Sequence, residues 1–211
     1  MQTKVIPIRA TIAPSQDHPA TAGDKARLRP ASAGLVVFAI ACTGLFALLT
    51  GQVDPSAMPL LGCWFIGGFV IQMSAALLER RSGPLAGGSA FLLLSAFFML
   101  AGGLEMILKY GALTAGAPLD GRIDGYAWIV LTLAAWLWTP AFWSGFSLLS
   151  VITALLDVAL PFMALTDLTL LPQGFRLIPA WALLLAAAAA VYLSAATLVN
   201  GARGKKVYPL S

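Results

Sequence analysis

The chain has 211 residues, of which 59% are apolar and only 10% are charged, and its mean hydropathy is +0.86. A soluble domain carries about a quarter charged residues, so this composition excludes an ordinary soluble domain and predicts an integral membrane protein. The net charge of +4 is too small and too scattered along the chain to indicate nucleic-acid binding.

Residues 1–30 form a polar leader rich in Pro, Thr, Ala and mixed charges. They contain no apolar stretch of the kind that a cleaved signal peptide needs. We therefore predict a disordered cytoplasmic tail here. The only histidine, His18, lies in this tail, which argues against a histidine-based catalytic or metal site within the membrane.

Long apolar runs follow the tail. A helix rises 1.5 Å per residue, so crossing a hydrocarbon core of about 30 Å takes roughly 20 apolar residues. Five runs are separated by Asp54-Pro55, by Glu79-Arg80-Arg81, by a polar loop after Lys109 and by a segment ending at Arg176. The expected single spans are Ala33–Thr50, Ala57–Leu78, Leu85–Leu108 and Leu177–Val199.

The remaining run, Tyr126–Leu165, has about 40 residues and would reach about 60 Å as one helix. That is twice the thickness of the core, so we predict two spans, with the turn near Pro140 or Trp143-Ser144-Gly145. Membrane β-strands alternate over about ten residues, and these runs are continuous and longer. The sequence therefore predicts an all-α domain of six transmembrane helices over residues 31–201, followed by a short basic tail at 202–211.

The positions of Lys and Arg predict the orientation of the bundle, because cytoplasmic segments carry the excess of positive charge. With both termini inside, three basic residues fall in outer loops: Lys109, Arg122 and Arg176. Ten fall on the cytoplasmic side: Lys4, Arg9, Lys25, Arg27, Arg29, Arg80, Arg81, Arg203, Lys205 and Lys206. We expect a multi-pass protein of the inner (plasma) membrane with cytoplasmic termini.

Small residues bring helices close together in lipid. They occur at Gly67-Gly68, Gly102-Gly103 and Ala186–Ala190. Packing within the chain and packing between subunits are both open from the sequence.

Asp157 is the most informative polar residue, because it lies near the middle of the fifth span. A carboxylate there costs roughly 2.5–3.5 kcal/mol on insertion scales, so it should face the bundle interior or a wet cavity. Pro161, four residues on, cannot donate to the carbonyl of Asp157 and leaves an acceptor beside the acid. Two interpretations stay open: a proton or substrate site, or a hydrogen-bonded acid that fixes helix packing.

Other polar residues in the spans are weaker candidates. Gln72 in the second span could bind a solute or a neighbouring helix, and Glu79 beside Arg80 and Arg81 favours an ion pair. No catalytic constellation, phosphate-binding loop or metal-ligand spacing is visible in the sequence. We expect no catalytic residue, cofactor or metal, and hence no enzyme.

Several segments carry a family resemblance. The stretch Arg29-Pro30-Ala31-Ser32-Ala33-Gly34-Leu35 aligns with an Asn-Pro-Ala-Pro-Leu-Gly-Leu motif, and Phe38 follows at the spacing of the motif's phenylalanine. The second span matches through Gly67-Gly68, Gln72 and Leu77-Leu78-Glu79. The C-terminal end matches through Val191-Tyr192-Leu193 and Val207-Tyr208-Pro209-Leu210. Over Arg29 to Leu210 the chain resembles the acetate uptake transporter family of small six-helix acetate and succinate transporters.

The resemblance implies a hexamer with a solute path through each subunit and a constriction made by a Phe, a Tyr and a Leu. By this resemblance Phe38 takes the first position, Leu94 replaces the tyrosine, and Leu155 takes the third. Pro30, Gly34 and Glu79 are the matching motif positions. Asp157 has no counterpart in the motif.

Two functional hypotheses follow from the sequence. The first is a proton-coupled carrier (a symporter) or channel for a small monocarboxylate such as acetate, with succinate a further candidate. The second is a non-transporting assembly or sensor subunit that keeps the family fold. Its partners are the lipid bilayer, other copies of the chain and, for the first hypothesis, the carboxylate.

Overall fold

The computed structural model describes residues 31–82, 85–143 and 147–210. The predicted tail, residues 1–30, and its motif residue Pro30 lie outside these ranges. The described residues contain six helical spans that are long and apolar enough to cross a membrane, and no strand. The predicted fold class, an all-α bundle of six membrane-spanning helices, is therefore confirmed.

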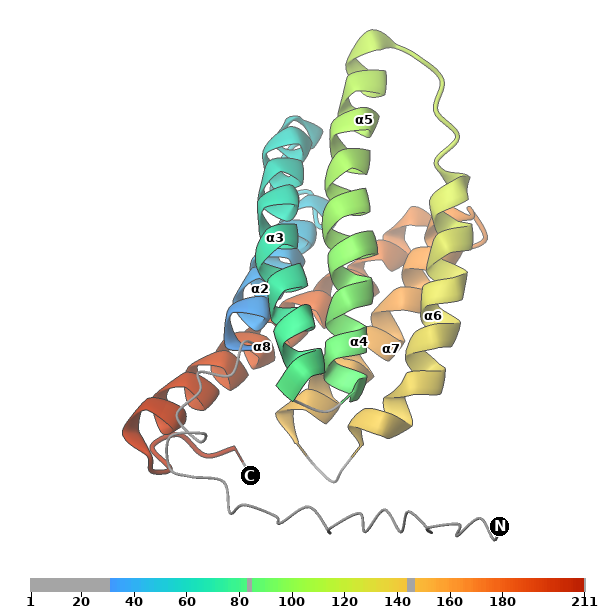
Figure 1. Ribbon diagram of the computed structural model, residues 1–211. Helices are drawn as coiled ribbons and strands as arrows, with labels where there is room; N and C mark the ends of the chain where they lie inside the picture. Colours follow the sequence, from blue (N-terminus) through green and yellow to red (C-terminus); the bar gives the residue numbers. More distant parts are fainter. Residues whose placement is uncertain (1–30, 83–84, 144–146, 211) are drawn as a thin grey trace, which may run out of the picture.

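The helices follow the predicted spans closely (Figure 1). The first three are α2 (Ala31–Leu49), α3 (Met58–Ser82) and a composite span of α4 (Leu85–Leu93), the π-helical segment η2 (Leu94–Ala101) and α5 (Gly102–Ala115). The last three are α6 (Arg122–Phe142), α7 (Leu148–Asp167) and α8 (Leu177–Arg203). Short 3₁₀ turns, η1 (Pro55–Ala57) and η3 (Gln173–Arg176), precede α3 and α8.

The run Tyr126–Leu165 is divided between α6 and α7, as its length predicted. The third span differs from its expected end at Leu108, because the helix continues to Ala115. Lys109 does not end it, since its ammonium pairs with Glu105 and Asp124. Gly116 ends it in the left-handed conformation, at φ 62°.

The helices form a ring in which most neighbours along the chain pack together. α6 packs on α7, α7 on α8, α8 on α2, α2 on α3, and α3 on the composite span. The seam between α4 and α6, which would complete the ring, has few contacts. We refer to the end of the bundle that holds Ala31, Ser82 and Arg203 as the tail end, and to the opposite end as the loop end.

The tightest contact, between α2 and α8, is made by small side chains. Ala180, Ala186 and Ala190 of α8 are fully buried, as is Cys42 of α2. The Ser194 hydroxyl donates to the carbonyl of Ser32 at 2.8 Å. Small residues suit this contact because lipid supplies no hydrophobic drive between helices, which must gain energy from close packing. Ala186–Ala190 therefore packs in part within the chain itself.

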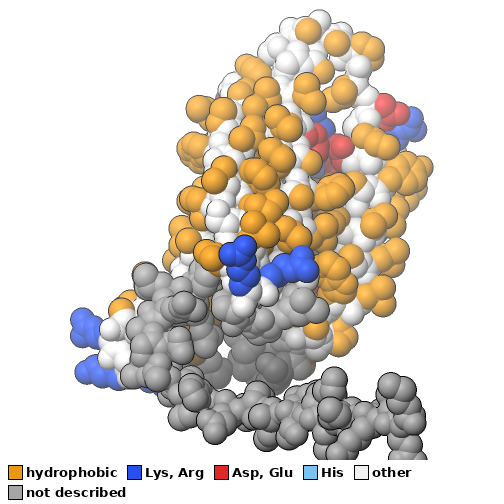
Figure 2. Space-filling model, viewed as in Figure 1, with side chains coloured by type: hydrophobic (Ala, Val, Ile, Leu, Met, Phe, Trp, Pro, Cys, Tyr) orange, Lys and Arg blue, Asp and Glu red, His pale blue; other side chains and the backbone are white. Residues whose placement is uncertain are grey.

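The outside of the bundle is apolar. Figure 2 shows hydrophobic side chains over most of the visible face, with Lys and Arg toward the tail end and a smaller group of basic and acidic side chains near the loop end. Exposed residues such as Leu108, Val130 and Leu137 occur on several spans. This distribution is the one that a lipid-facing surface requires.

The predicted basic tail begins after α8 and turns back along it. The side chain of Asn200 accepts hydrogen bonds from the amides of Val207 (2.7 Å) and Tyr208 (2.9 Å) and donates to the carbonyl of Tyr208 (2.7 Å). The hydroxyl of Tyr192 donates to the carbonyl of Pro209 at 3.0 Å. These bonds hold the last described residues against the tail end of α8.

Candidate functional site

An elongated cavity of ≈ 460 Å³ lies inside the ring. Every span contributes to its wall, from Glu79 and Thr197 near the tail end to Leu45 and Trp128 near the loop end. Leu149 and Met163 of α7 both line it, and fourteen residues of helix span about 21 Å. The cavity therefore extends along about two thirds of a hydrocarbon core of about 30 Å.

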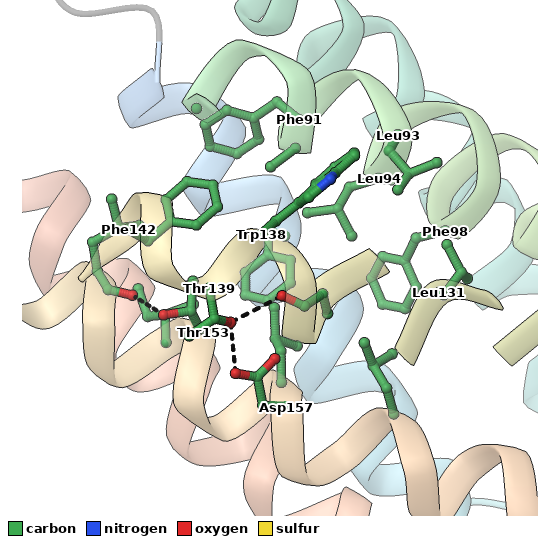
Figure 3. A pocket seen from close by; sticks show the side chains of 18 of the residues that line it. Phe91, Leu93, Leu94, Phe98, Leu131, Trp138, Thr139, Phe142, Thr153 and Asp157 are labelled. Atoms are coloured by element: carbon green, nitrogen blue, oxygen red, sulfur yellow. Dashed lines mark hydrogen bonds between the residues drawn. The ribbon is translucent and has the colours of Figure 1, made fainter. Parts of the chain in front are cut away.

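Aromatic rings dominate the wall. Phe38 of α2, 3% exposed, packs on Phe98 of η2 with ring centroids 6.2 Å apart, and Phe98 packs on Phe65 at 5.4 Å. Figure 3 shows Phe91, Phe98, Trp138 and Phe142 around the space. The π-helical turn widens the helix here and contributes Leu94, Phe97 and Phe98 to the wall.

The three residues assigned to a constriction by resemblance occupy different environments. Phe38 and Leu94 both line the cavity. Leu155 is half-buried against the core of the bundle, and it is its neighbour Leu156 that lines the cavity. One residue on a helix is a rotation of 100°, which resemblance over scattered motifs does not resolve.

Asp157 places its carboxyl at the cavity wall against α6 (Figure 3). Its Oδ2 lies 2.6 Å from the hydroxyl of Thr139, which also lies 3.0 Å from the carbonyl of Ala135. Its Oδ1 is buried and has no hydrogen-bond partner among the described residues. A buried polar oxygen without a partner carries a desolvation penalty of about 1–3 kcal/mol.

The backbone of Asp157 has a partner that the sequence did not reveal. Pro161 leaves the carbonyl of Asp157 without its helical donor. The indole Nε1 of Trp136 on α6 donates to this carbonyl at 3.0 Å. Both the side chain and the main chain of Asp157 are thus bonded to α6, so the acid also ties α6 to α7.

The other polar groups of the cavity are few. Thr153 donates its hydroxyl to the carbonyls of Ser150 (2.9 Å) and Leu149 (3.1 Å). Glu79 lines the tail end, and its carboxylate lies close to Gly87, where a Cβ would approach Oε2 to 2.7 Å. Among the described lining residues two are acidic and none is Lys, Arg or His.

The remaining predicted residues lie away from the cavity. Gln72 is fully buried on α3, and neither atom of its amide has a partner within the described part of the chain. Gly34 lies where α2 approaches α3 and α4, with Ala75 and Phe91 as the nearest side chains. In residues 31–82, 85–143 and 147–210, no group of three or more His, Cys, Asp or Glu is placed to hold a metal ion.

Three site residues were missed by sequence reasoning: Thr139, Trp138 and Phe98. Thr139 offered a weak signal, since it is a hydroxyl in an apolar span that precedes a proline. Which face of a helix it occupies depends on how α6 packs on α7, and a single sequence does not reveal that packing.

A second polar cluster lies near the loop end. Lys109 of α5 pairs with Glu105 on its own helix and with Asp124 of α6 at 2.5 Å, and Arg176 pairs with Asp167 at 3.1 Å. In the loop before α6, hydrogen bonds from the guanidinium of Arg122 lower the pKa of Asp120 to about 2. These charges lie outside the cavity wall.

Together the ring and the cavity define a six-helix membrane bundle with an internal space along its length. The chain is similar to the solved structure of the bacterial acetate channel SatP, with a TM-score of 0.74. The match has 20% sequence identity and covers 87% of this chain and 98% of that chain. At this identity the likeness establishes the fold. Comparison with protein-family models and with curated proteins gives no match.

Proposed function

We propose that this protein is a membrane transporter or channel for a small monocarboxylate such as acetate, with succinate as a further candidate. The cavity that extends along the bundle carries the proposal. The shared fold with a bacterial acetate channel supports it. The family resemblance read from the motifs points the same way.

The apolar wall determines what passes. Rings such as Phe38 and Phe98, with Leu94, offer no groups that replace a hydration shell, so hydrated inorganic ions are excluded. A small acid loses little hydration when its carboxyl is protonated. Leu155 remains a proposed constriction residue on the basis of resemblance alone, and Leu156 is the alternative in the same turn.

Asp157 is the proposed site of proton coupling. The hydroxyl of Thr139 has one hydrogen and two acceptors within reach, the carboxyl of Asp157 and the carbonyl of Ala135. With a charged Asp157 this hydrogen points to the carboxylate. With a protonated Asp157 the acid donates to Thr139, which donates to Ala135. The pair therefore holds or releases a proton with little movement.

Uptake of labelled acetate into proteoliposomes between pH 5 and pH 7 tests both the transport of acetate and the role of Asp157 in proton coupling. We expect wild-type uptake to depend on pH and Asp157→Asn to remove that dependence while expression and assembly stay intact. Asp120→Asn, in the exposed loop, is the matched control and should behave as wild type. If uptake by Asp157→Asn still depends on pH, Asp157 is not part of the mechanism.

Absence of acetate uptake by the wild-type protein would support the second hypothesis, an assembly or sensor subunit. A deletion strain that keeps normal growth on acetate and normal sensitivity to acetic acid would agree with it. The homo-oligomer, a hexamer by resemblance, and the inner-membrane location with cytoplasmic termini remain proposals. Native mass spectrometry and labelling of the termini in intact cells address them.

A further inference from the structure

The cavity is much larger than acetate requires. A volume of ≈ 460 Å³ lies within the range of about 300–1,000 Å³ that binds drug-sized molecules. Acetate has only two carbons, and bound alone it would leave most of the aromatic wall without contact. Rings such as Phe91, Trp138 and Phe142 instead provide a long apolar surface.

The polar groups of the cavity suit a protonated carboxyl group, which both donates and accepts a hydrogen bond. The hydroxyl hydrogens of Thr139 and Thr153 already have backbone or carboxyl acceptors, and the indole N–H of Trp138 is a donor at the wall. Oδ1 of Asp157 is an acceptor that lacks a partner among the described residues. It is covered by neighbouring protein atoms, so a ligand reaches it when the carboxyl turns slightly toward the cavity. The ligand must then donate a hydrogen bond, which a carboxylate anion does not do.

Charge leads to the same conclusion. The titratable groups of the described wall are Asp157 on α7 and Glu79 on α3, and α2, α4, η2, α6 and α8 contribute none there. An anion inside this space would meet the carboxyl group of Asp157, and no Lys, Arg or His lines the described wall to offset the repulsion at a low local dielectric. An uncharged acid avoids both penalties.

We propose that the cavity binds the uncharged, protonated form of a monocarboxylic acid whose apolar chain is longer than that of acetate. Its O–H donates to Oδ1 of Asp157, and its chain lies along the rings of η2 and α6. This inference depends on the proposed function only in taking the cavity as the solute path, and it names the form and size class of the solute.

The test measures binding to the purified protein in detergent through tryptophan fluorescence, since Trp128 and Trp138 line the cavity. Hexanoic and octanoic acid are compared at pH 5, 6 and 7. We expect about fourfold tighter binding per added methylene. Above the ligand's own pKa, apparent affinity should fall about tenfold per pH unit, because only the protonated acid binds.

Variants distinguish binding of the acid in the cavity from its partition into detergent micelles. Asp157→Leu should weaken octanoic acid at least tenfold, and Ala90→Phe, which fills the cavity from α4, should abolish binding while leaving Asp157 in place. Asp120→Asn should bind as wild type. Methyl octanoate, which has the same chain but no donor, should bind at least tenfold more weakly than the acid.

Any of three binding results would overturn the inference. The first is an octanoic acid affinity that is unchanged between pH 5 and pH 7, and the second is an affinity that is equal in wild type and Ala90→Phe. The third is octylammonium binding more tightly than octanoic acid, which would indicate a cation site. Acetate uptake without octanoic acid binding leaves the proposed function standing and removes this inference. Octanoic acid binding without acetate uptake would leave this inference standing and remove the proposed function.

Discussion

Asp157 shows how one residue can serve both architecture and chemistry. Its carboxyl is bonded to Thr139 and its carbonyl to Trp136, so two side chains of α6 hold one residue of α7. The sequence offered two interpretations of this acid, helix packing or a functional site. The geometry is compatible with both at once, because one oxygen is used in packing and the other has no partner among the described residues.

The indole bond can be tested separately from the carboxyl. Trp136→Phe keeps a large ring but removes the donor, leaving the carbonyl of Asp157 without a partner at the Pro161 kink. Hydrogen bonds between membrane helices contribute about 0.6 kcal/mol on average and at most about 1.7 kcal/mol. We expect a loss in that range in the free energy of unfolding, measured by denaturation in detergent. Trp138→Phe should lose less, because the indole of Trp138 donates no hydrogen bond within the described part of the chain, and equal losses would contradict the assignment.

At the scale of elements, close approach of α3 and the composite span depends on two glycines. A Cβ on Gly103 would lie 2.7 Å from the carbonyl oxygen of Gly62, and a Cβ on Gly62 would lie 2.6 Å from that of Gly103. Neither backbone can give way without separating the helices. The predicted packing role of Gly102-Gly103 thus has a specific partner, whereas Gly67 has open space around it.

Gly103→Ala should therefore destabilise the protein by about 1–3 kcal/mol, the usual cost of overpacking. The matched control is Gly111→Ala on the same helix, where nothing lies within 4 Å. Alanine is the better helix former by about 1 kcal/mol, so the control should be neutral or stabilising. Unfolding of both variants in the same detergent provides the comparison. A stable Gly103→Ala variant would mean that α3 and α5 are further apart than described.

At the scale of the whole molecule, the seam between the composite span and α6 is the weak point of the ring. At the loop end it is bridged by the ion pair of Lys109 with Asp124, whose side chains are 30% and 14% exposed. At the tail end α4 and α6 make only thin contact. Phe97 of η2 and Trp138 of α6 line the cavity and are 52% and 40% exposed, so the cavity is already partly open to the surface.

Lys109→Gln should weaken the loop end by about 1–2 kcal/mol, between the values for exposed and buried pairs. Arg122→Gln breaks an ion pair of similar length whose side chains are both 62% exposed, and should change stability less than Lys109→Gln does, because solvent screens an exposed pair. Removing both charges in Lys109→Gln with Asp124→Asn should recover part of the loss. Equal effects of the two single substitutions would show that Lys109 does not close the ring.

The number of spans, their order and most of their boundaries could be predicted because they depend on local quantities. The length of an apolar run set against the membrane thickness divides Tyr126–Leu165 between α6 and α7 without any knowledge of packing. Where a boundary differed, at Lys109, the cause was tertiary. Asp124 on α6 pairs with the lysine, and the helix runs past it.

The sequence by itself therefore determined a six-helix membrane bundle and identified Asp157 as the polar group to explain. Only the tertiary structure decided that Leu156 and not Leu155 faces the cavity, that Thr139 meets the acid and that Trp136 takes the carbonyl freed by Pro161. The physical reason is that insertion in lipid depends on the composition of each segment. The rotation of one helix against another depends on the packing of the whole ring.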